Sequence, residues 1–350
     1  MNARGRRRLR VGLIGLGRLG RVYARDLASR IPETRLAAVA DTNAAAARET
    51  AAEWDVASWY ETPDPLFADP NVDAVVIVSP THTHRDVVIE ATRSGKPIFC
   101  EKPLALSLAE CREMQAAVER SGTFFQMGFM RRFDPGYAAA KRQVEEGRIG
   151  RPVVFKSTSR DPYPPSLEYA NPASSGGILV DMGIHDFDLA RWFMGDVASV
   201  SAIGGVLAYP ELATVGDIDN AIASLVFTDG RLGVIDLTRN GFYGYDIVTE
   251  LLGTEGTVRI GYLRETPITV MTKNSVAHDT VPYFMERFER AYTRQLQDFA
   301  QNVLGEREPP VTIRDGVEAL RIALAAAESY RAGCTVHLLT PDLQLPKERH

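Results

Sequence analysis

Short apolar runs alternate with stretches of helical periodicity through the first third of the chain. This alternation is typical of βαβ units, whose parallel strands form a sheet between helices. Residues 74–78 are apolar throughout, as expected for a strand covered on both faces. The predicted strands are 9–14, 35–40, 74–78, 97–100 and 124–127, and the predicted helices are 18–29, 43–53, 84–93 and 108–120. We therefore expect an α/β domain with a doubly wound parallel sheet that ends near residue 128.

After residue 128 the apolar runs are separated by turn residues, which is typical of hairpins in an open antiparallel sheet. Residues 161–177 are rich in proline, serine and glycine and predict a long loop, a kind of segment that often carries function. The other predicted elements are helix 135–146, strand 152–158, apolar runs 197–208, 221–227, 231–238, 246–252 and 257–260, and helices near 284–303 and 314–331. We expect two domains, 1–128 and 129–350. The second is α+β with a large open, mostly antiparallel sheet, and its C-terminal helices can pack back on the first.

Composition and charge narrow the class of protein. Residues 1–10 contain five arginines and no acid, so the other 340 residues hold 35 basic and 45 acidic side chains. A body that acidic does not suit broad nucleic-acid binding, which needs basic surface. The arginines predict a solvated arm, and they are Arg4, Arg6, Arg7, Arg8 and Arg10.

The three cysteines, Cys100, Cys111 and Cys334, are too few for a disulfide framework or a four-cysteine metal site. We therefore expect a cytoplasmic protein. No apolar stretch approaches the roughly 20 residues that span a bilayer, so a membrane is not an expected partner.

A glycine-rich turn follows the first predicted strand and opens the first predicted helix. The residues Gly15-Leu16-Gly17-Arg18-Leu19-Gly20 match G-x-G-x-x-G in the context that the dinucleotide-binding (Rossmann) fingerprint requires. In that fingerprint Gly15 allows the tight turn, Gly17 the close approach of pyrophosphate, and Gly20 the packing of helix on strand. Backbone N–H groups at the helix start hold the phosphate charge. An ordinary glycine turn is the alternative.

Asp41 lies 21 residues after Gly20, at the carboxyl end of the second predicted strand. Its carboxylate can accept hydrogen bonds from both ribose hydroxyls of adenosine and would repel a 2′-phosphate. Thr42 and Asn43 follow it, so no arginine directly follows to bind such a phosphate. We therefore expect NAD rather than NADP as the cofactor.

The segment 79–84 follows the next strand, where the crevice loops of a doubly wound sheet meet a cofactor. Ser79, Thr81 and His84 are the candidate cofactor contacts, with helix capping as the alternative. His82 and His84 are spaced as a metal pair could be. Because no cysteine or third histidine lies near them in sequence, we expect no metal.

Glu101-Lys102-Pro103 comes directly after strand 97–100. A lysine at the end of a strand that faces a nicotinamide is well placed to be a catalytic cation. A surface lysine before a proline is the alternative.

An Asp–His pair lies in the second domain, within residues 176–188. On one continuous helix, Asp181 and His185 are at positions i and i+4, so their side chains share a face. Alcohol oxidation needs a base for the hydroxyl proton, and a carboxylate can orient the imidazole and stabilise its cation. Lys102 could stabilise the developing alkoxide. A helix N-terminal acid and a surface histidine are the alternatives.

Together, the glycine turn, Glu101-Lys102-Pro103 and Asp181-x-x-x-His185 resemble the Gfo/Idh/MocA oxidoreductase family over roughly residues 9–340. The stretches 128–134 and 243–246 resemble its inositol 2-dehydrogenase branch. The resemblance implies that Lys102, Asp181 and His185 are catalytic, with His185 as the acid/base. It implies cofactor contacts from the glycine turn, Glu101 and Lys102. It also implies a cis bond before Pro103 and dimers or tetramers packed through the open sheet.

The resemblance further implies a set of substrate contacts beside the three catalytic residues. They are Met130, Arg131, Asp161, Tyr243 and Tyr245. Arginine, aspartate and tyrosine suit a ring with several hydroxyls, each of which needs a directional partner. Core packing is the alternative for Met130 and the tyrosines.

We therefore expect an NAD-dependent dehydrogenase that oxidises a secondary alcohol of a cyclic polyol, myo-inositol first, to a ketone. Oxidation of a sugar or amino sugar by the same residues is the nearest alternative. A non-catalytic regulator that senses NAD belongs to a different class, and the presence of a proton-transfer set argues against it. A metal hydrolase built on His82, His84 and His185 is weaker still.

Overall fold

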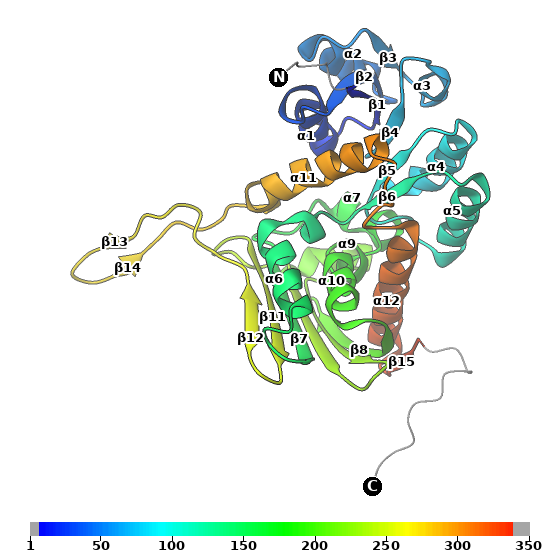
Figure 1. The fold of residues 1–350 in the computed structure, drawn as a ribbon. Coiled ribbons are helices and arrows are strands. Elements are labelled where there is room, and N and C mark those ends of the chain that lie inside the picture. Colours follow the sequence, from blue (N-terminus) through cyan, green and yellow to red (C-terminus); the bar gives the residue numbers. More distant parts are fainter. Residues whose placement is uncertain (1–6, 339–350) are drawn as a thin grey trace. The chain divides into compact units, whose positions relative to one another are not determined.

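The computed structural model describes residues 7–338, which fold as two compact units. The first unit comprises residues 7–133 together with 290–317, and the second comprises 134–289 together with 318–338 (Figure 1). Two long helices near the end of the chain contribute to both units. They are α11 (Phe284–Leu304) and α12 (Ile313–Ala332).

The first unit contains a six-stranded sheet in the order β3-β2-β1-β4-β5-β6, with every neighbouring pair parallel. Its strands are β1 (Leu9–Ile14), β2 (Thr34–Ala40), β3 (Ser58–Tyr60), β4 (Ala74–Ile77), β5 (Ile98–Glu101) and β6 (Phe125–Gly128). The predicted doubly wound sheet is confirmed. Because the strand order reverses between β1 and β4, the carboxyl ends of these two strands flank the point where such sheets bind ligands.

The helical elements of this unit are α1 (Arg18–Arg25), η1 (Asp26–Arg30), α2 (Ala44–Glu53), α3 (Asp64–Ala68), η2 (Thr81–Thr83), α4 (His84–Arg93), α5 (Leu108–Ser121) and η3 (Met130–Phe133). The single helix predicted over 18–29 is wrong in its second half, because the chain widens into the π-helical turn η1. At that turn the buried Asp26 carboxylate accepts hydrogen bonds from Arg25 (2.9 Å) and from Thr293 of α11 (2.7 Å). The short elements β3 and α3 were not predicted.

The five arginines of residues 1–10 do not all belong to the solvated arm that the sequence predicted. Arg4 and Arg6 lie outside the described residues. Arg10 belongs to β1, and its guanidinium donates to the Asp73 carboxylate over 2.7 Å. Arg7 approaches the same carboxylate at 3.7 Å, so this end of the run is tied to the sheet.

The second unit is built on a seven-stranded sheet in the order β12-β11-β7-β10-β9-β8-β15. Its strands are β7 (Pro152–Arg160), β8 (Val197–Gly205), β9 (Asn220–Phe227), β10 (Leu232–Thr238), β11 (Asp246–Gly253), β12 (Thr257–Ile260) and β15 (Val336–His337). Only β7 and β10 pair in parallel, so the prediction of a large, mostly antiparallel sheet is confirmed.

Helices and loops complete the second unit. The helices are α6 (Pro135–Glu145), α7 (Leu167–Ala170), α8 (Pro172–Ser175), α9 (Ile178–Asp181), α10 (Ile184–Met194) and η4 (Pro210–Val215). A hairpin of β13 (Val270–Met271) and β14 (Val276–Ala277) extends away from the sheet (Figure 1). Within residues 7–338, no helix combines the length and apolarity needed to span a membrane.

The two faces of this sheet differ. A buried polar chain on one face runs from the Tyr137 hydroxyl through Thr249 (2.8 Å) and Ser157 (3.1 Å) to the Asp186 carboxylate of α10 (2.5 Å). Ser159 donates to the same carboxylate. Since side chains alternate along a strand, the neighbouring residues point to the opposite face. Helix α10 is therefore fixed to one face of the sheet by a buried acid.

Candidate active site

The first unit carries the predicted cofactor half of the site at the ends of β1, β2 and β4. Gly15 has a φ of +92°, and a Cβ there would lie 2.6 Å from the Ser79 nitrogen. A Cβ at Gly20 would lie 2.0 Å from the Gly15 oxygen. At Gly17, which caps α1, a Cβ would meet nothing within 4 Å. Two glycines thus hold the turn against the sheet, and the third leaves the open space that a pyrophosphate needs.

Asp41 is fixed beside this turn. Its Oδ2 accepts a hydrogen bond from the Leu16 N–H (2.6 Å), and its Oδ1 accepts one from the Asn43 N–H (2.8 Å). A carboxylate has about four acceptor positions, so two remain for ribose hydroxyls. The open space at Gly17, the start of α1 at Arg18 and Leu19, and this carboxylate together fit NAD.

His84 is buried between two loops. Its Nε2 lies 2.9 Å from the Ser79 carbonyl oxygen and its Nδ1 lies 3.0 Å from the Pro103 carbonyl oxygen. Burial lowers the pKa of His84. Ser79 also exchanges a hydrogen bond with Thr83 (2.7 Å), while Thr81 begins η2 and is only half-buried. The ring of His84 therefore ties the β4 loop to the loop after β5, which does not favour its predicted contact with the cofactor.

Lys102 lies in the loop that follows β5. The bond between Lys102 and Pro103 is cis, as the resemblance implied. The Lys102 N–H donates to Glu101 Oε2 over 3.0 Å, and the Glu101 side chain is buried. Glu101, predicted as a cofactor contact, is thus an internal partner of the lysine backbone. Met130 and Arg131 lie on η3, which follows the neighbouring strand β6, and both are buried.

In the second unit, Asp181 and His185 belong to different helices. The continuous helix predicted around them is wrong: α9 ends at Asp181 and α10 begins at Ile184. A Cβ at Gly183 would lie 2.6 Å from the Leu179 oxygen and 2.9 Å from a Leu237 methyl group, so glycine is needed at this junction. The proximity of Asp181 and His185 therefore no longer follows from helical spacing.

Two side chains that the sequence analysis missed, Tyr169 and Arg239, contact Asp181, and a third, Asp217, pairs with Arg239. The Tyr169 hydroxyl donates to Asp181 Oδ1 over 2.9 Å, and the negative charge of Asp181 raises the pKa of Tyr169. The buried Arg239 guanidinium lies 3.8 Å from Asp181 Oδ2 and also pairs with Asp217. Asp217 in turn accepts from the Ile178 N–H at the start of α9 (3.1 Å). The carboxylate of Asp181 is thus presented on a helix that is held by a buried ion pair.

The predicted substrate contacts of this unit are spread over both sides of the sheet. The Tyr243 hydroxyl donates to Asp246 Oδ2 (2.9 Å) and lies 3.3 Å from Arg160 Nη1. Arg160 follows Ser159 in β7, so the two side chains point to opposite faces of the sheet. Because Ser159 faces α10, Arg160 and the hydroxyl of Tyr243 belong to the opposite face. The structure therefore does not bring this hydroxyl together with the helix that carries His185.

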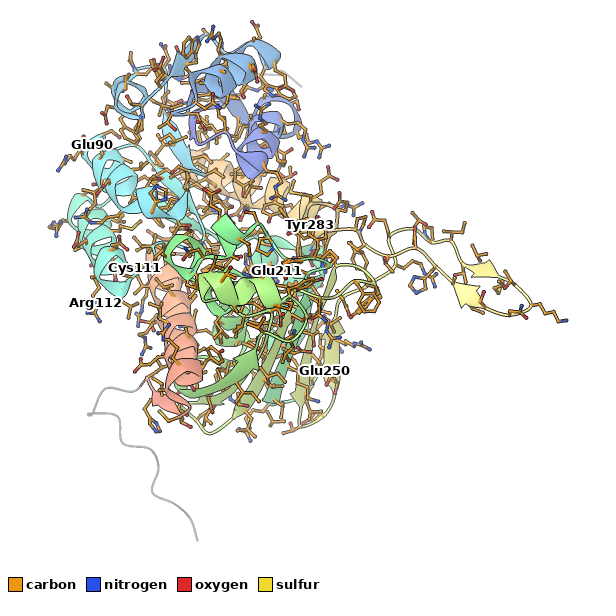
Figure 2. All side chains as sticks on the ribbon, turned by 180° about the vertical axis from the view of Figure 1, so that it is seen from behind. Glu90, Cys111, Arg112, Glu211, Glu250 and Tyr283 are labelled. Carbon is orange, nitrogen blue, oxygen red and sulfur yellow. The ribbon has the colours of Figure 1, made fainter. Side chains whose placement is uncertain are left out.

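Tyr245 is buried against Tyr283, labelled in Figure 2, with ring centroids 5.6 Å apart, and against Phe288 at 6.2 Å. These contacts are those of a packed aromatic cluster. Asp161 is held by its backbone, since its N–H donates to the Thr238 oxygen (2.9 Å) and its carbonyl accepts from the Gly241 N–H (2.8 Å). The role of the Asp161 side chain in substrate binding, like that of His185, stays a prediction.

Comparison with known proteins gives the family. Residues 9–129 match the profile described as "Oxidoreductase family, NAD-binding Rossmann fold", and residues 141–338 match "Oxidoreductase family, C-terminal alpha/beta domain". The chain belongs to the Gfo/Idh/MocA oxidoreductase family. The family and the NAD-binding fold expected from the sequence are confirmed.

Named inositol dehydrogenases are similar to this protein over nearly the whole chain. The scyllo-inositol 2-dehydrogenase (NAD(+)) of Bacillus subtilis is 40% identical over 94% of this chain and 96% of its own length. The myo-inositol 2-dehydrogenase of Thermotoga maritima is 40% identical over 94% and 98%. The structure of scyllo-inositol dehydrogenase from Lactobacillus casei with bound NAD(H) and scyllo-inositol has a TM-score of 0.90, at 33% identity over 95% of this chain and 99% of that one.

The glycine turn predicts opposite effects for two substitutions. Gly17→Ala adds a methyl group in open space, so thermal stability should stay at the wild-type level while NADH binding weakens at least about tenfold. Gly20→Ala forces α1 away from β1 and should destabilise the protein by about 1–3 kcal/mol. Thermal unfolding and fluorescence titration with NADH measure both. Wild-type NADH affinity in Gly17→Ala would contradict the assignment of the pyrophosphate site.

The buried His84 predicts a pH dependence of stability. Its folded pKa is lowered below its ordinary value of 6.5, so only the unfolded chain takes up this proton as the pH falls. His84 thus contributes fully above about pH 6.5, and the free energy of unfolding declines below it by up to about 1.4 kcal/mol per pH unit. In His84→Gln, denaturant unfolding between pH 7.5 and 5.5 should show a smaller decline. The exposed neighbour is the control: His82→Gln should keep the wild-type decline, and an unchanged decline in His84→Gln would refute the account.

Proposed function

We propose that this protein oxidises a secondary alcohol of a cyclic polyol to a ketone with NAD. The proposed polyol is an inositol, with myo-inositol as the leading candidate. One observation carries the proposal. The acid–base sequence Asp181-x-x-x-His185 stands in a chain whose first unit has the NAD-binding turn, and the Asp181 carboxylate is held in place by Tyr169. Relatives named as inositol 2-dehydrogenases, similar over more than nine-tenths of the chain, support the substrate class.

The residues divide the chemistry between them. Bound at the glycine turn and Asp41, NAD would supply the acceptor for the hydrogen and electron pair that leave the carbinol carbon. His185 takes the hydroxyl proton, and the Asp181 carboxylate stabilises the resulting imidazolium. The Lys102 ammonium stabilises the negative charge that develops on the alcohol oxygen. Among the residues expected to hold the ring, Asp161 and Arg131 carry the charged groups that suit ring hydroxyls. The Tyr243 hydroxyl donates to Asp246, and the Tyr245 ring packs on Tyr283.

The alternatives fit the structure less well. A sugar or amino-sugar dehydrogenase would use the same residues, and only the substrate decides. An NAD-sensing regulator would not need a carboxylate held before His185. A metal site at His84 is disfavoured, because both of its ring nitrogens already face backbone carbonyls.

We also propose that the protein is a homo-oligomer, a dimer or a tetramer, packed through the open face of its seven-stranded sheet. Ile203 and Ile222 lie opposite each other on this face, and both are exposed, as are Leu232 and Leu252. Glu250, labelled in Figure 2, lies on the same face and pairs with Lys156 at 3.4 Å. An apolar surface rimmed by charges is typical of an interface between proteins.

The proposed setting is the cytoplasm. All three cysteines are free, and Cys100 and Cys111 are buried as thiols. Free thiols suit a reducing compartment, which also contains NAD.

The proposed activity is tested by a screen for reduction of NAD⁺ and NADP⁺ with inositol isomers, aldoses and amino sugars at mildly alkaline pH. We expect the highest kcat/KM with NAD⁺ and an inositol. His185→Ala and Lys102→Ala should each lower kcat at least about 100-fold, while fluorescence titration shows retained NADH binding in His185→Ala. Activity with NADP⁺ alone would contradict the role of Asp41. NADH binding without turnover of any alcohol would favour the regulator.

The proposed interface on the open face of the sheet is tested by a substitution that places a charge on it. We expect the wild-type protein to sediment as a dimer or tetramer of 38.5 kDa chains and Ile222→Glu to sediment as a smaller species, because a buried unpaired carboxylate is costly. Trp59→Gln is the control, since Trp59, like Ile222, is a partly exposed large apolar residue but lies in the first unit. A wild-type monomer, or an unchanged assembly in Ile222→Glu, would contradict this interface.

A further inference from the structure

Glu101, the last residue of β5, is a buried carboxylate that receives three hydrogen bonds. Its Oε1 accepts from the Tyr23 hydroxyl and from Gln295 Nε2 (3.1 Å), and its Oε2 accepts from the Lys102 N–H (3.0 Å). Gln295 Nε2 also donates to the Tyr23 oxygen. The amide of Gln295 thus uses both of its hydrogens, and the hydroxyl of Tyr23 uses its one hydrogen on Glu101. The three hydrogen bonds that this carboxyl group makes within residues 7–338 are all accepted from donors, as an ionised carboxylate requires.

The two side-chain donors come from distant parts of the chain. Tyr23 lies on α1, the helix that opens at the dinucleotide turn, and Gln295 lies on α11, 272 residues further along. Both side chains are fully buried. The Gln126 amide of β6 donates to the backbone oxygen of Gln295 (3.2 Å), which fixes this part of α11 to the sheet.

The surrounding packing is shaped around the carboxylate. A Cβ at Gly128 would lie 2.9 Å from Glu101 Cδ, so only glycine leaves room for the side chain. The ring of Tyr23 packs against Phe99 and Tyr292, each with ring centroids 6.1 Å apart. Burial raises the pKa of Glu101, whereas the hydrogen bonds from Tyr23, Lys102 and Gln295 lower it. Removal of a donor should therefore raise this pKa further.

We propose that Tyr23 and Gln295 are positioning residues for Lys102. They hold one oxygen of Glu101, and the other oxygen holds the Lys102 amide, so the backbone that presents the catalytic lysine is set by α1 and α11. The proposal rests on the catalytic role of Lys102 given above. It adds two residues that no motif contains, and it makes the helix of the dinucleotide turn part of the support of the lysine.

The test uses Tyr23→Phe and Gln295→Leu in the full-length protein. Hydrogen exchange at the Lys102 amide, read by mass spectrometry of peptides that span the segment, should accelerate at least about fivefold in both variants, because its acceptor is no longer fixed. The kcat for the best polyol should fall about tenfold, while the Kd for NADH stays within about threefold of wild type. The acidic limb of the kcat–pH profile should move to higher pH, since Glu101 loses a donor to its ionised form.

Phe299→Leu is the matched control. Phe299 lies on α11 and packs on Phe99 (5.8 Å), so the substitution loosens the same core without removing a donor. It should lower Tm and leave the exchange of the Lys102 amide and the pH profile as in wild type. Tyr23→Phe removes a single oxygen atom and keeps the ring, so it remains a test if Gln295→Leu does not fold.

The proposal is overturned if Tyr23→Phe leaves the exchange of the Lys102 amide at the wild-type rate, or changes it no more than Phe299→Leu does. Amide exchange does not depend on turnover. An enzyme inactive with every alcohol would refute the proposed function, whereas the exchange experiment would still decide whether Tyr23 and Gln295 fix this backbone.

Discussion

The close packing of α1 against the end of β1 is the constraint on which the first unit depends. No side chain fits at Gly20, where a Cβ would meet the Gly15 oxygen, so the helix starts directly at the sheet. That position has two consequences. It leaves the N-terminus of the helix open at Gly17 for a phosphate group, and it places Tyr23, on the buried side of the helix, against Glu101. The proposed phosphate site and the proposed support of Lys102 thus depend on the same helix.

In the second unit, buried charged side chains hold the helices that carry the proposed catalytic residues. Its proposed base, His185, lies on α10, which two serines fix to the sheet through Asp186. The proposed carboxylate partner, Asp181, lies at the end of α9, which the Arg239–Asp217 pair holds. A buried ion pair contributes little net stability, but the loss of one partner is costly. Here the Arg239–Asp217 pair fixes α9, which carries Asp181, and the hydrogen bonds to Asp186 fix α10, which carries His185.

The sequence was sufficient to predict features that depend on residues close together in the chain. The parallel strands, the glycine turn and Asp41 could be predicted because each depends on neighbours within one βαβ unit. The break between α9 and α10 could not, since the need for glycine at position 183 depends in part on Leu237, which lies on the distant strand β10. Tyr169 lay within the loop expected to carry function, but nothing in its spacing pointed to Asp181. Gln295 acts on a residue 194 positions away, and only the fold brings the two together.

The central claim is that hydrogen passes from a polyol carbon to NAD while the protein takes the hydroxyl proton. It is tested most directly with myo-inositol deuterated at every carbon, in ordinary water, by mass spectrometry of the reduced coenzyme. The account predicts that each molecule of NADH formed carries one deuterium atom from the polyol. Reduced coenzyme without deuterium, or no reduction of NAD⁺ by any inositol isomer, would contradict it.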